Sequence, residues 1–155
     1  MFFAIPATMR AQAPAPRDTT PVLLTTGAFF ALSVSDLEAS TKWYSEKLGL
    51  SVVFQIPKQN KAAVRVLLGG GLAVELIQND DAVPLRTAAP QVTSNILVHG
   101  IFKVGLFVED FDRTLAILRE RNVEIAFGPF PKRPHQPANV GIRDNAGNLI
   151  HIFGK

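Results

Sequence analysis

Hydrophobic and polar positions follow the same course twice along the chain. The first course begins with an alternating apolar run at Phe29–Val34, continues through Asp36, and leads into a stretch with apolar residues three or four positions apart. The second course begins at Lys103–Val108 and repeats this order, with Asp110 corresponding to Asp36 at an offset of 74. A repeat of this length predicts two copies of one structural module, related by a pseudo-twofold axis.

Each module is predicted to contain one strand, one helix and three further strands. The helices are expected to begin after the capping residues Asp36 and Asp110, and the first is expected to end at Gly49. The predicted strands of the first module are Phe29–Val34, Val52–Ile56, Ala62–Leu68 and Leu72–Gln78, with Pro57–Lys61 as a turn. Those of the second module are Lys103–Val108, Val123–Phe127, Asn139–Arg143 and Asn148–Phe153, with a proline-rich hairpin at Pro129–Pro137. The fold class is therefore α+β, with two tandem βαβββ modules forming a cupped, pseudo-twofold mixed sheet.

The predicted domain covers residues 27–155, with module 1 at 27–78, a linker at 79–99 and module 2 at 100–155. Residues 1–26 contain four prolines and no sustained period. They include a short apolar run, Phe2–Met9, and a small-x-small sequence, Ala11-Gln12-Ala13, but no basic residue precedes the run. We expect a disordered N-terminal arm, and a truncated export signal is the alternative.

Strand alternation separates a core face from a candidate functional face. The uniformly apolar face, with Phe30 and Leu32 in module 1 and Val104 and Leu106 in module 2, is expected to lie under the helix. The opposite face of the first and fourth strands carries Phe29, Ala31, Glu75, Lys103, Gly105, Phe107, His151 and Phe153. Two such faces turned toward each other would enclose a largely apolar cup with three ionisable groups.

Composition narrows the range of functions. The 155 residues contain no cysteine, which excludes disulfides, thiolate metal sites and a cysteine nucleophile. The net charge of +3 comes from scattered Lys and Arg, so nucleic-acid binding is not expected. No apolar run is long enough to span a bilayer. We expect a cytoplasmic location, or a periplasmic or secreted one if the N-terminus derives from an export signal.

Several strings along the chain match a known superfamily. They are Val34–Ser40, Val74–Leu76, Val108–Asp110 and Asp144–Ile150. With these strings the chain resembles the vicinal oxygen chelate superfamily, which includes glyoxalase I, bleomycin- and fosfomycin-resistance proteins, extradiol dioxygenases and methylmalonyl-CoA epimerase. The resemblance covers residues 27–155. It implies the fold and a homodimer, but it is weak for activity because the superfamily hosts unrelated chemistries.

The resemblance also implies where a divalent metal would bind. In metal-dependent members, the first and fourth strands of each module supply the ligands, and those positions here hold Phe29, Glu75, Lys103 and His151. Phe has no lone pair to donate, and a charged Lys repels a cation. Only Glu75 and His151 remain as ligands, fewer than a firm site requires. We therefore predict no metal cofactor. If a metal is present, Glu75 and His151 are its expected ligands.

The first functional hypothesis is that the positive charge of Lys103 replaces the positive charge of a metal ion. The Lys103 ammonium would stand where a metal sits, facing Glu75, with His151 hydrogen-bonded to the same group. The protein would bind a small, largely apolar organic ligand in the cup. The predicted ligand-binding residues are Phe29, Ala31, Gly105, Phe107, Phe153 and Arg143, the last as a clamp for an anion at the cup mouth.

Two enzymatic hypotheses remain beside it. Glu75, Lys103 and His151 are candidate catalytic residues of a lyase or isomerase that moves protons next to a carbonyl. Alternatively, a glyoxalase-like or dioxygenase-like metalloenzyme would use Glu75 and His151 with a third ligand such as His99 or His135.

Overall fold

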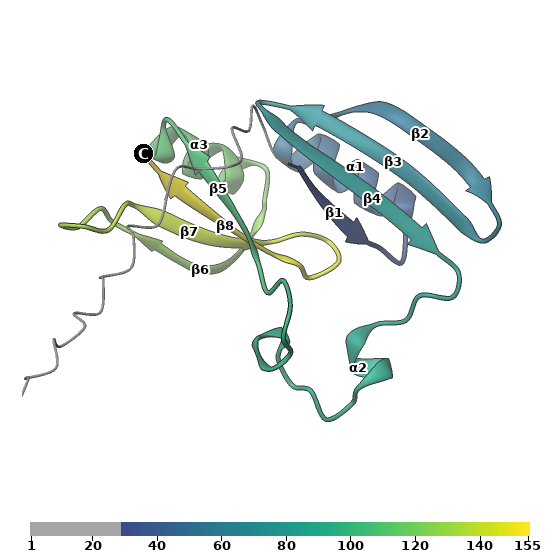
Figure 1. Ribbon diagram of the computed structural model, residues 1–155. Coiled ribbons are helices and arrows are strands. Elements are labelled where there is room, and N and C mark those ends of the chain that lie inside the picture. Colours follow the sequence, from purple (N-terminus) through teal and green to yellow (C-terminus); the bar gives the residue numbers. More distant parts are fainter. Residues whose placement is uncertain (1–28) are drawn as a thin grey trace, which may run out of the picture.

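Figure 1 shows the computed structural model, which describes residues 29–155. The predictions for residues 1–26 lie outside the described residues. One four-stranded sheet has the order β1-β4-β3-β2, formed by Phe29–Ser33, Leu72–Asn79, Ala62–Gly69 and Ser51–Gln59. The other has the order β5-β8-β7-β6, formed by Val104–Val108, Leu149–Gly154, Asn139–Arg143 and Glu124–Phe130. The predicted α+β fold with two tandem βαβββ modules is confirmed.

The same strand pairing is repeated in both sheets. The first strand of each module pairs parallel with the fourth, so Ala31 lies beside Glu75 and Gly105 lies beside His151. The third and fourth strands pair antiparallel, as do the second and third. A parallel pair requires a crossover, and the helix after each first strand provides it. The two open faces therefore display equivalent positions in the same order.

The helices begin and end where their local sequence predicts. Helix α1 (Leu37–Leu48) starts after Asp36, whose carboxylate accepts the Ala39 N–H at 2.9 Å, and ends at Gly49 with φ of +76°. Helix α3 (Phe111–Glu120) starts after Asp110 in the same way. No helix within residues 29–155 has the length and apolar character that a membrane crossing requires.

The core lies between each sheet and its helix. Tyr44 from α1, Leu67 from β3 and Leu76 from β4 are fully buried there, as are Ile142 and Ile150 in the second module. On β1 and β5, the residues predicted to face the helix are partly buried, and their alternating neighbours are exposed. The assignment of the two faces from strand alternation is therefore correct.

Two strands extend further than their sequences predict. Strand β2 continues through Pro57 to Gln59, and the turn shrinks to Asn60 and Lys61, which have positive φ values of 46° and 73°. Pro57 is tolerated because β2 is an edge strand and its register shifts between Ile56 and Gln59. Strand β6 likewise runs to Phe130, three residues beyond the predicted end.

The linker between the modules contains two short turns, α2 (Leu85–Ala88) and the 3-10 turn η1 (Asn95–Leu97). It loops away from both sheets (Figure 1). Most of its apolar side chains are exposed, and Leu97 is 66% exposed. The linker therefore adds nothing to the core of the single chain.

The two modules contact each other at equivalent helix ends. The Lys47 ammonium donates to the carbonyl of Arg121, and the Arg121 guanidinium donates to the carbonyl of Lys47 at 3.1 Å. The two residues are 74 positions apart, which is the offset of the repeat. Each cation thus lies at the C-terminal end of the other module's helix, where a helix dipole favours positive charge. The pseudo-twofold axis passes between them.

A buried carboxylate makes the second contact between the modules. Asp144, in the β7–β8 turn, is 4% exposed and accepts the Tyr44 hydroxyl at 2.9 Å. It also accepts the backbone N–H groups of Ala146 and Asn148 and the side-chain amide of Asn148. Burial, reinforced by the Asp144 charge, raises the pKa of the Tyr44 hydroxyl. The neutral phenol is therefore a stable donor that joins α1 to the second sheet.

Candidate functional site

A continuous row of aromatic rings crosses the open face of the second sheet. Phe107 stacks on Phe153 with ring centroids 5.4 Å apart, and Phe153 lies 3.9 Å from the imidazole of His151. His151 meets the edge of Phe127 at 4.9 Å, and Phe127 stacks with Phe130 at 6.4 Å. Strands β5, β8 and β6 contribute these side chains. We call this set of five rings the aromatic row.

The row is continuous because the central strand beneath it carries a glycine. Gly141 on β7 pairs with His151 on one side and with Phe127 on the other. A Cβ on Gly141 would lie 2.2 Å from Cε1 of Phe127. The phenyl ring therefore occupies the space above the glycine and reaches the imidazole.

His151 is held in one neutral form at the centre of the row. The side chain is 8% exposed, and its Nδ1 lies 2.9 Å from Nζ of Lys103 while its Nε2 lies 3.0 Å from Oδ1 of Asn139. A charged Lys only donates, so Nδ1 accepts and Nε2 donates to Asn139. Burial first, and then the charge of Lys103, lower the pKa of His151. The Asn139 amide is oriented in turn by donating to the carbonyl of Pro137 at 3.0 Å.

Lys103 pairs with His151 and not with Glu75. It lies immediately before β5, is exposed, and has two further N–H groups beyond the one directed at the imidazole. Glu75 lies on β4 of the other sheet, and no side-chain hydrogen bond or ion pair joins its carboxylate to another of residues 29–155. The predicted ion pair between Glu75 and Lys103 is therefore not formed within the chain. The reason is that the two residues belong to the open faces of different sheets.

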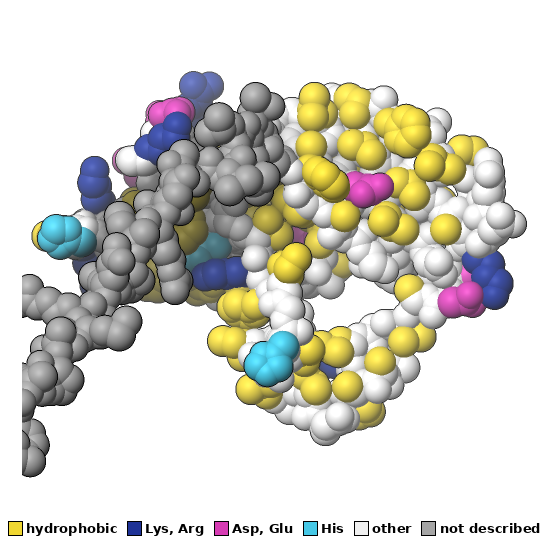
Figure 2. Space-filling model, viewed as in Figure 1, with side chains coloured by type: hydrophobic (Ala, Val, Ile, Leu, Met, Phe, Trp, Pro, Cys, Tyr) yellow, Lys and Arg dark blue, Asp and Glu magenta, His cyan; other side chains and the backbone are white. Residues whose placement is uncertain are grey.

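The open face of the first sheet is apolar around Glu75. The register places Val66 beside Glu75 and Phe54 beside Val66. Phe54 and Leu68 are 54% and 51% exposed. Figure 2 shows hydrophobic side chains gathered over this face with an acidic group among them. The face has the character of a binding surface, because apolar patches of this kind mark interaction sites.

The remaining predicted ligand-binding residues lie on both open faces. Phe29 and Ala31 are on the exposed side of β1, and Phe29 is 66% exposed. Gly105 is on the exposed side of β5, where it leaves room beside the ring of Phe153. Arg143 is already engaged, with its Nε 3.6 Å from the Glu124 carboxylate and Nη1 donating to the Gly147 carbonyl.

Four site residues were not predicted from sequence, and one of them, Phe130, ends the aromatic row. Asn139 and Phe127 hold and cover His151, and Gly141 makes room for the phenyl ring. Strand alternation does put Asn139 and Gly141 on the same face as each other, two positions apart. The signal that would have found them is a polar amide and a glycine at alternate positions of a strand that is otherwise buried and apolar.

The residues at the expected metal positions do not fit a divalent cation. Phe29 offers no donor atom, and Lys103 brings a positive charge to the imidazole nitrogen that would have to bind the ion. The other imidazole nitrogen is directed at Asn139. Within residues 29–155, no three His, Asp or Glu side chains gather as a metal site requires. The His99 and His135 alternatives gain no support from this geometry.

A profile of the glyoxalase/bleomycin resistance protein/dioxygenase superfamily matches residues 28–152. The chain belongs to this superfamily. The resemblance seen in the sequence strings is thereby confirmed. Membership in the superfamily accounts for the duplicated βαβββ module and for the position of the open faces.

Solved structures show the same fold at low sequence identity. A glyoxylase/bleomycin resistance protein/dioxygenase domain from Frankia sp. EAN1pec is 19% identical, with 85% of this chain and 93% of that chain covered and a TM-score of 0.66. The antibiotic-binding protein TnmS3 from Streptomyces sp. CB03234 is 21% identical, with 84% and 96% covered and a TM-score of 0.59. The fosfomycin resistance protein FosX from Listeria monocytogenes is 12% identical, with 84% and 94% covered and a TM-score of 0.59. A comparison with curated proteins gives no match.

Proposed function

We propose that this superfamily member binds a small, largely apolar organic molecule against the aromatic row, without a divalent metal. The observation that carries the proposal is the row itself, with a neutral His151 and the Lys103 ammonium at its centre. Sites for small organic molecules combine apolar and aromatic walls with a few placed polar groups. TnmS3, a structural neighbour, is an antibiotic-binding protein, which is consistent with this use of the fold.

The proposed ligand contacts follow from the exposure of the rings. Phe107 is 69% exposed and extends the face that Phe153 begins, so a flat ring can stack there. Lys103 has N–H groups available for a carbonyl or phenolate oxygen of the same ligand. Arg143 forms an ion pair with Glu124. The predicted role of Arg143 as an anion clamp would require this ion pair to open.

A homodimer would supply the second wall of the cup. In the single chain, Phe29, Phe54 and Phe107 are each more than half exposed, so the open faces do not cover each other. The contacts between the modules, at Lys47–Arg121 and Tyr44–Asp144, use the helices and a turn. We propose that the first sheet of one copy covers the aromatic row of a second copy, bringing Glu75 toward the partner's ligand.

The Lys103–His151 contact favours one second candidate function. A donor and acceptor 2.9 Å apart can exchange a proton, so the pair is suited to acid–base catalysis next to a carbonyl. The enzyme would be a lyase or isomerase, with Glu75 as the further acid–base group. The dioxygenase form of this alternative needs a metal, and the donor set does not fit one.

Native mass spectrometry with metal analysis on protein purified without added metal is the first test. We expect a dimer, no stoichiometric divalent ion and, where a ligand co-purifies, the mass of a small organic molecule. A stoichiometric divalent ion would contradict the proposal that binding is independent of metal. Turnover that is lost in Lys103→Met while ligand binding is retained would favour the enzymatic alternative.

Binding of 2-naphthol, a neutral fluorescent aromatic, tests the aromatic row directly. We expect Phe107→Ala to weaken binding about tenfold, because it removes an exposed stacking surface. Phe102→Ala is the matched control, since Phe102 is an exposed phenylalanine two residues before β5 and outside the row. Equal affinity of the two variants would exclude the row as the binding surface.

We propose a cytoplasmic location, and secretion assays of a fusion to residues 1–26 would test the export alternative.

A further inference from the structure

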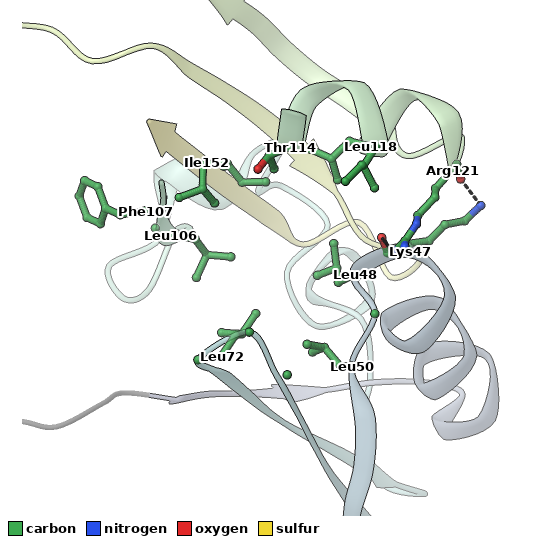
Figure 3. A pocket seen from close by; sticks show the side chains of 17 residues that line it. Lys47, Leu48, Leu50, Leu72, Leu106, Phe107, Thr114, Leu118, Arg121 and Ile152 are labelled. Carbon is green, nitrogen blue, oxygen red and sulfur yellow. Dashed lines mark hydrogen bonds between the residues drawn. The ribbon is translucent and has the colours of Figure 1, made fainter. Parts of the chain in front are cut away.

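A cavity lies between the two modules, apart from the centre of the aromatic row. Its volume is about 530 Å³, and the end of α1, the β3–β4 turn, strand β5 and helix α3 surround it. Figure 3 shows its lining side chains. Leu106 and Ile152 line it from the helix-facing side of the second sheet, whereas His151 faces the other side. We call this cavity the inter-module groove. Phe107, at one end, is the only residue it shares with the row.

The walls of the inter-module groove are apolar. Leu48, Leu50 and Leu72 of the first module lie opposite Leu106 and Ile152 of the second (Figure 3). The glycines at 69–71 form the adjoining turn and add no side chains. A saturated hydrocarbon chain suits such walls better than a flat polar ring, because it gains burial against branched side chains on both sides.

One end of the groove carries two positive charges without a matching acid. Lys47 and Arg121 line this end, and no Asp or Glu is among the lining residues. Neither cation forms an ion pair within residues 29–155. Each uses one N–H on a backbone carbonyl of the other, which leaves two donors on the Lys and four on the Arg. The guanidinium lies against the groove, since a Cβ at Gly49 would be 3.6 Å from Arg121 Nη1.

We propose that the inter-module groove binds an amphipathic carboxylate, with its hydrocarbon chain between the leucines and its carboxylate on Lys47 and Arg121. The charge of Lys47 and Arg121 selects an anion, and Arg provides a fork of N–H groups that matches a carboxylate. Residues 1–28 are a poor occupant, because their charged side chains are Arg10, Arg17 and Asp18, with a net positive charge. The groove shares only Phe107 with the aromatic row, and the carboxylate site at Lys47 and Arg121 does not depend on the function proposed for the row.

Calorimetric titration of the full chain with three ten-carbon probes tests the ligand class. The probes are decanoate, 1-decanol and decyltrimethylammonium. We expect decanoate to bind at least about tenfold more tightly than the other two, because a charge-assisted contact separates them. Equal binding of decanoate and decanol would overturn the proposal in favour of a purely apolar groove. Absence of decanoate binding would overturn it altogether and would leave 2-naphthol binding at the row unaffected.

Charge-removing variants with matched controls locate the carboxylate. Lys47→Met and Arg121→Met should each weaken decanoate binding about tenfold. Lys42→Met on α1 and Arg119→Met on α3 remove equal charges outside the groove, and both should bind as the unaltered protein does. Arg121→Lys keeps the charge but not the fork of N–H groups, and should lose less affinity than Arg121→Met. Equal losses of decanoate affinity in Lys42→Met and Lys47→Met would show that the overall charge of the protein, and not the groove, determines binding. That result would overturn the proposed site.

Methyl NMR then reports where the probe lies, even if a variant folds poorly. Decanoate should shift the methyl signals of Leu48, Leu72 and Ile152. Shifts confined to Ile56 and Val66, on the open face of the first sheet, would place the probe in the cup and overturn the assignment to the groove.

Discussion

The two open faces are built on one framework and differ at its centre. In the first sheet, Glu75 has Val66 beside it on the next strand, and in the second sheet His151 has Gly141 in that place. Beyond them lie Phe54 and Phe127. Phe54 is 54% exposed, whereas Phe127 lies over the glycine and meets the imidazole. One missing side chain thus turns an exposed phenylalanine into part of a continuous aromatic surface.

This difference shows how a duplicated module acquires two surfaces with different chemistry. The first face keeps an acid in apolar surroundings. The second face encloses a neutral histidine between rings, with Lys103 and Asn139 fixing its two nitrogens. A face of each kind, brought together, would provide both walls of a cup. The following experiments change the contrast between them, from the largest expected effect to the smallest.

Loss of the buried carboxylate should remove the support on which both faces depend. Asp144→Ala leaves the buried Tyr44 hydroxyl and the turn N–H groups without their acceptor. We expect the free energy of unfolding to fall by about 3 to 4 kcal/mol, measured by urea denaturation with Trp43 fluorescence. Asp112→Ala, an exposed first-turn acid on α3, is the control. A loss below about 1 kcal/mol would show that the modules do not rely on this contact.

Truncation of the two equivalent phenylalanines measures the contrast directly. Phe127→Ala should cost about 2 to 3 kcal/mol because the ring packs on Gly141, Phe130 and His151. Phe54→Ala should cost less than about 1 kcal/mol in the monomer, where the ring is mostly in water. Urea denaturation at dilutions that give a monomer provides both numbers. Equal losses would mean that the two faces are buried alike and that the contrast is absent in solution.

Exchange of the central residue should make the second face resemble the first. Gly141→Val places a side chain where Phe127 lies, so the ring must move, at a cost of about 1 to 3 kcal/mol. The reverse change, Val66→Gly, should cost about 1 kcal/mol, since it removes a half-buried side chain without a clash. Chemical denaturation of both variants gives the comparison. A Gly141→Val protein as stable as the original would contradict the packing described for the row.

The pH dependence of stability should reflect the titration of His151. The folded pKa lies below the ordinary value of 6.5 through burial and the Lys103 charge, so the unfolded chain takes up the proton first as pH falls. The contribution of neutral His151 to the free energy of unfolding is therefore fully present above about pH 6.5. It is lost as the pH falls toward the folded pKa, by at most about 1.4 kcal/mol per pH unit. His151→Gln should flatten this decline, and the exposed His135→Gln should leave it unchanged. Denaturation between about pH 8 and pH 5 measures it.

Local sequence predicted the elements and their faces well. Asp36, Gly49 and Asp110 cap their helices through contacts within a few residues, and strand alternation needs only the chain itself. The edge position of β2 was not predictable in this way. It depends on strand order, and only an edge strand accepts Pro57 without losing a ladder hydrogen bond.

The centre of the candidate site could be predicted only in part. Parity placed Glu75, Lys103 and His151 on open faces, but which of them meet depends on how the two sheets are set, and Lys103 meets His151 alone. The aromatic row also depends on irregular pairing, because the register of β6 shifts on both sides of Phe127. Such shifts leave no periodic signal in the sequence, so the contact of Phe127 with Gly141 emerges only from the three-dimensional arrangement.

The contact of Lys47 with Arg121 joins a position to its own counterpart, and this has a consequence for the history of the chain. In an assembly of two identical units, a residue on the twofold axis touches its own copy, and any substitution there changes both sides at once. An unfused module with a cation at this position would have formed that contact with itself, each ammonium or guanidinium resting on the other's helix end. Within one chain the two positions can change independently, and they hold Lys47 on one side and Arg121 on the other.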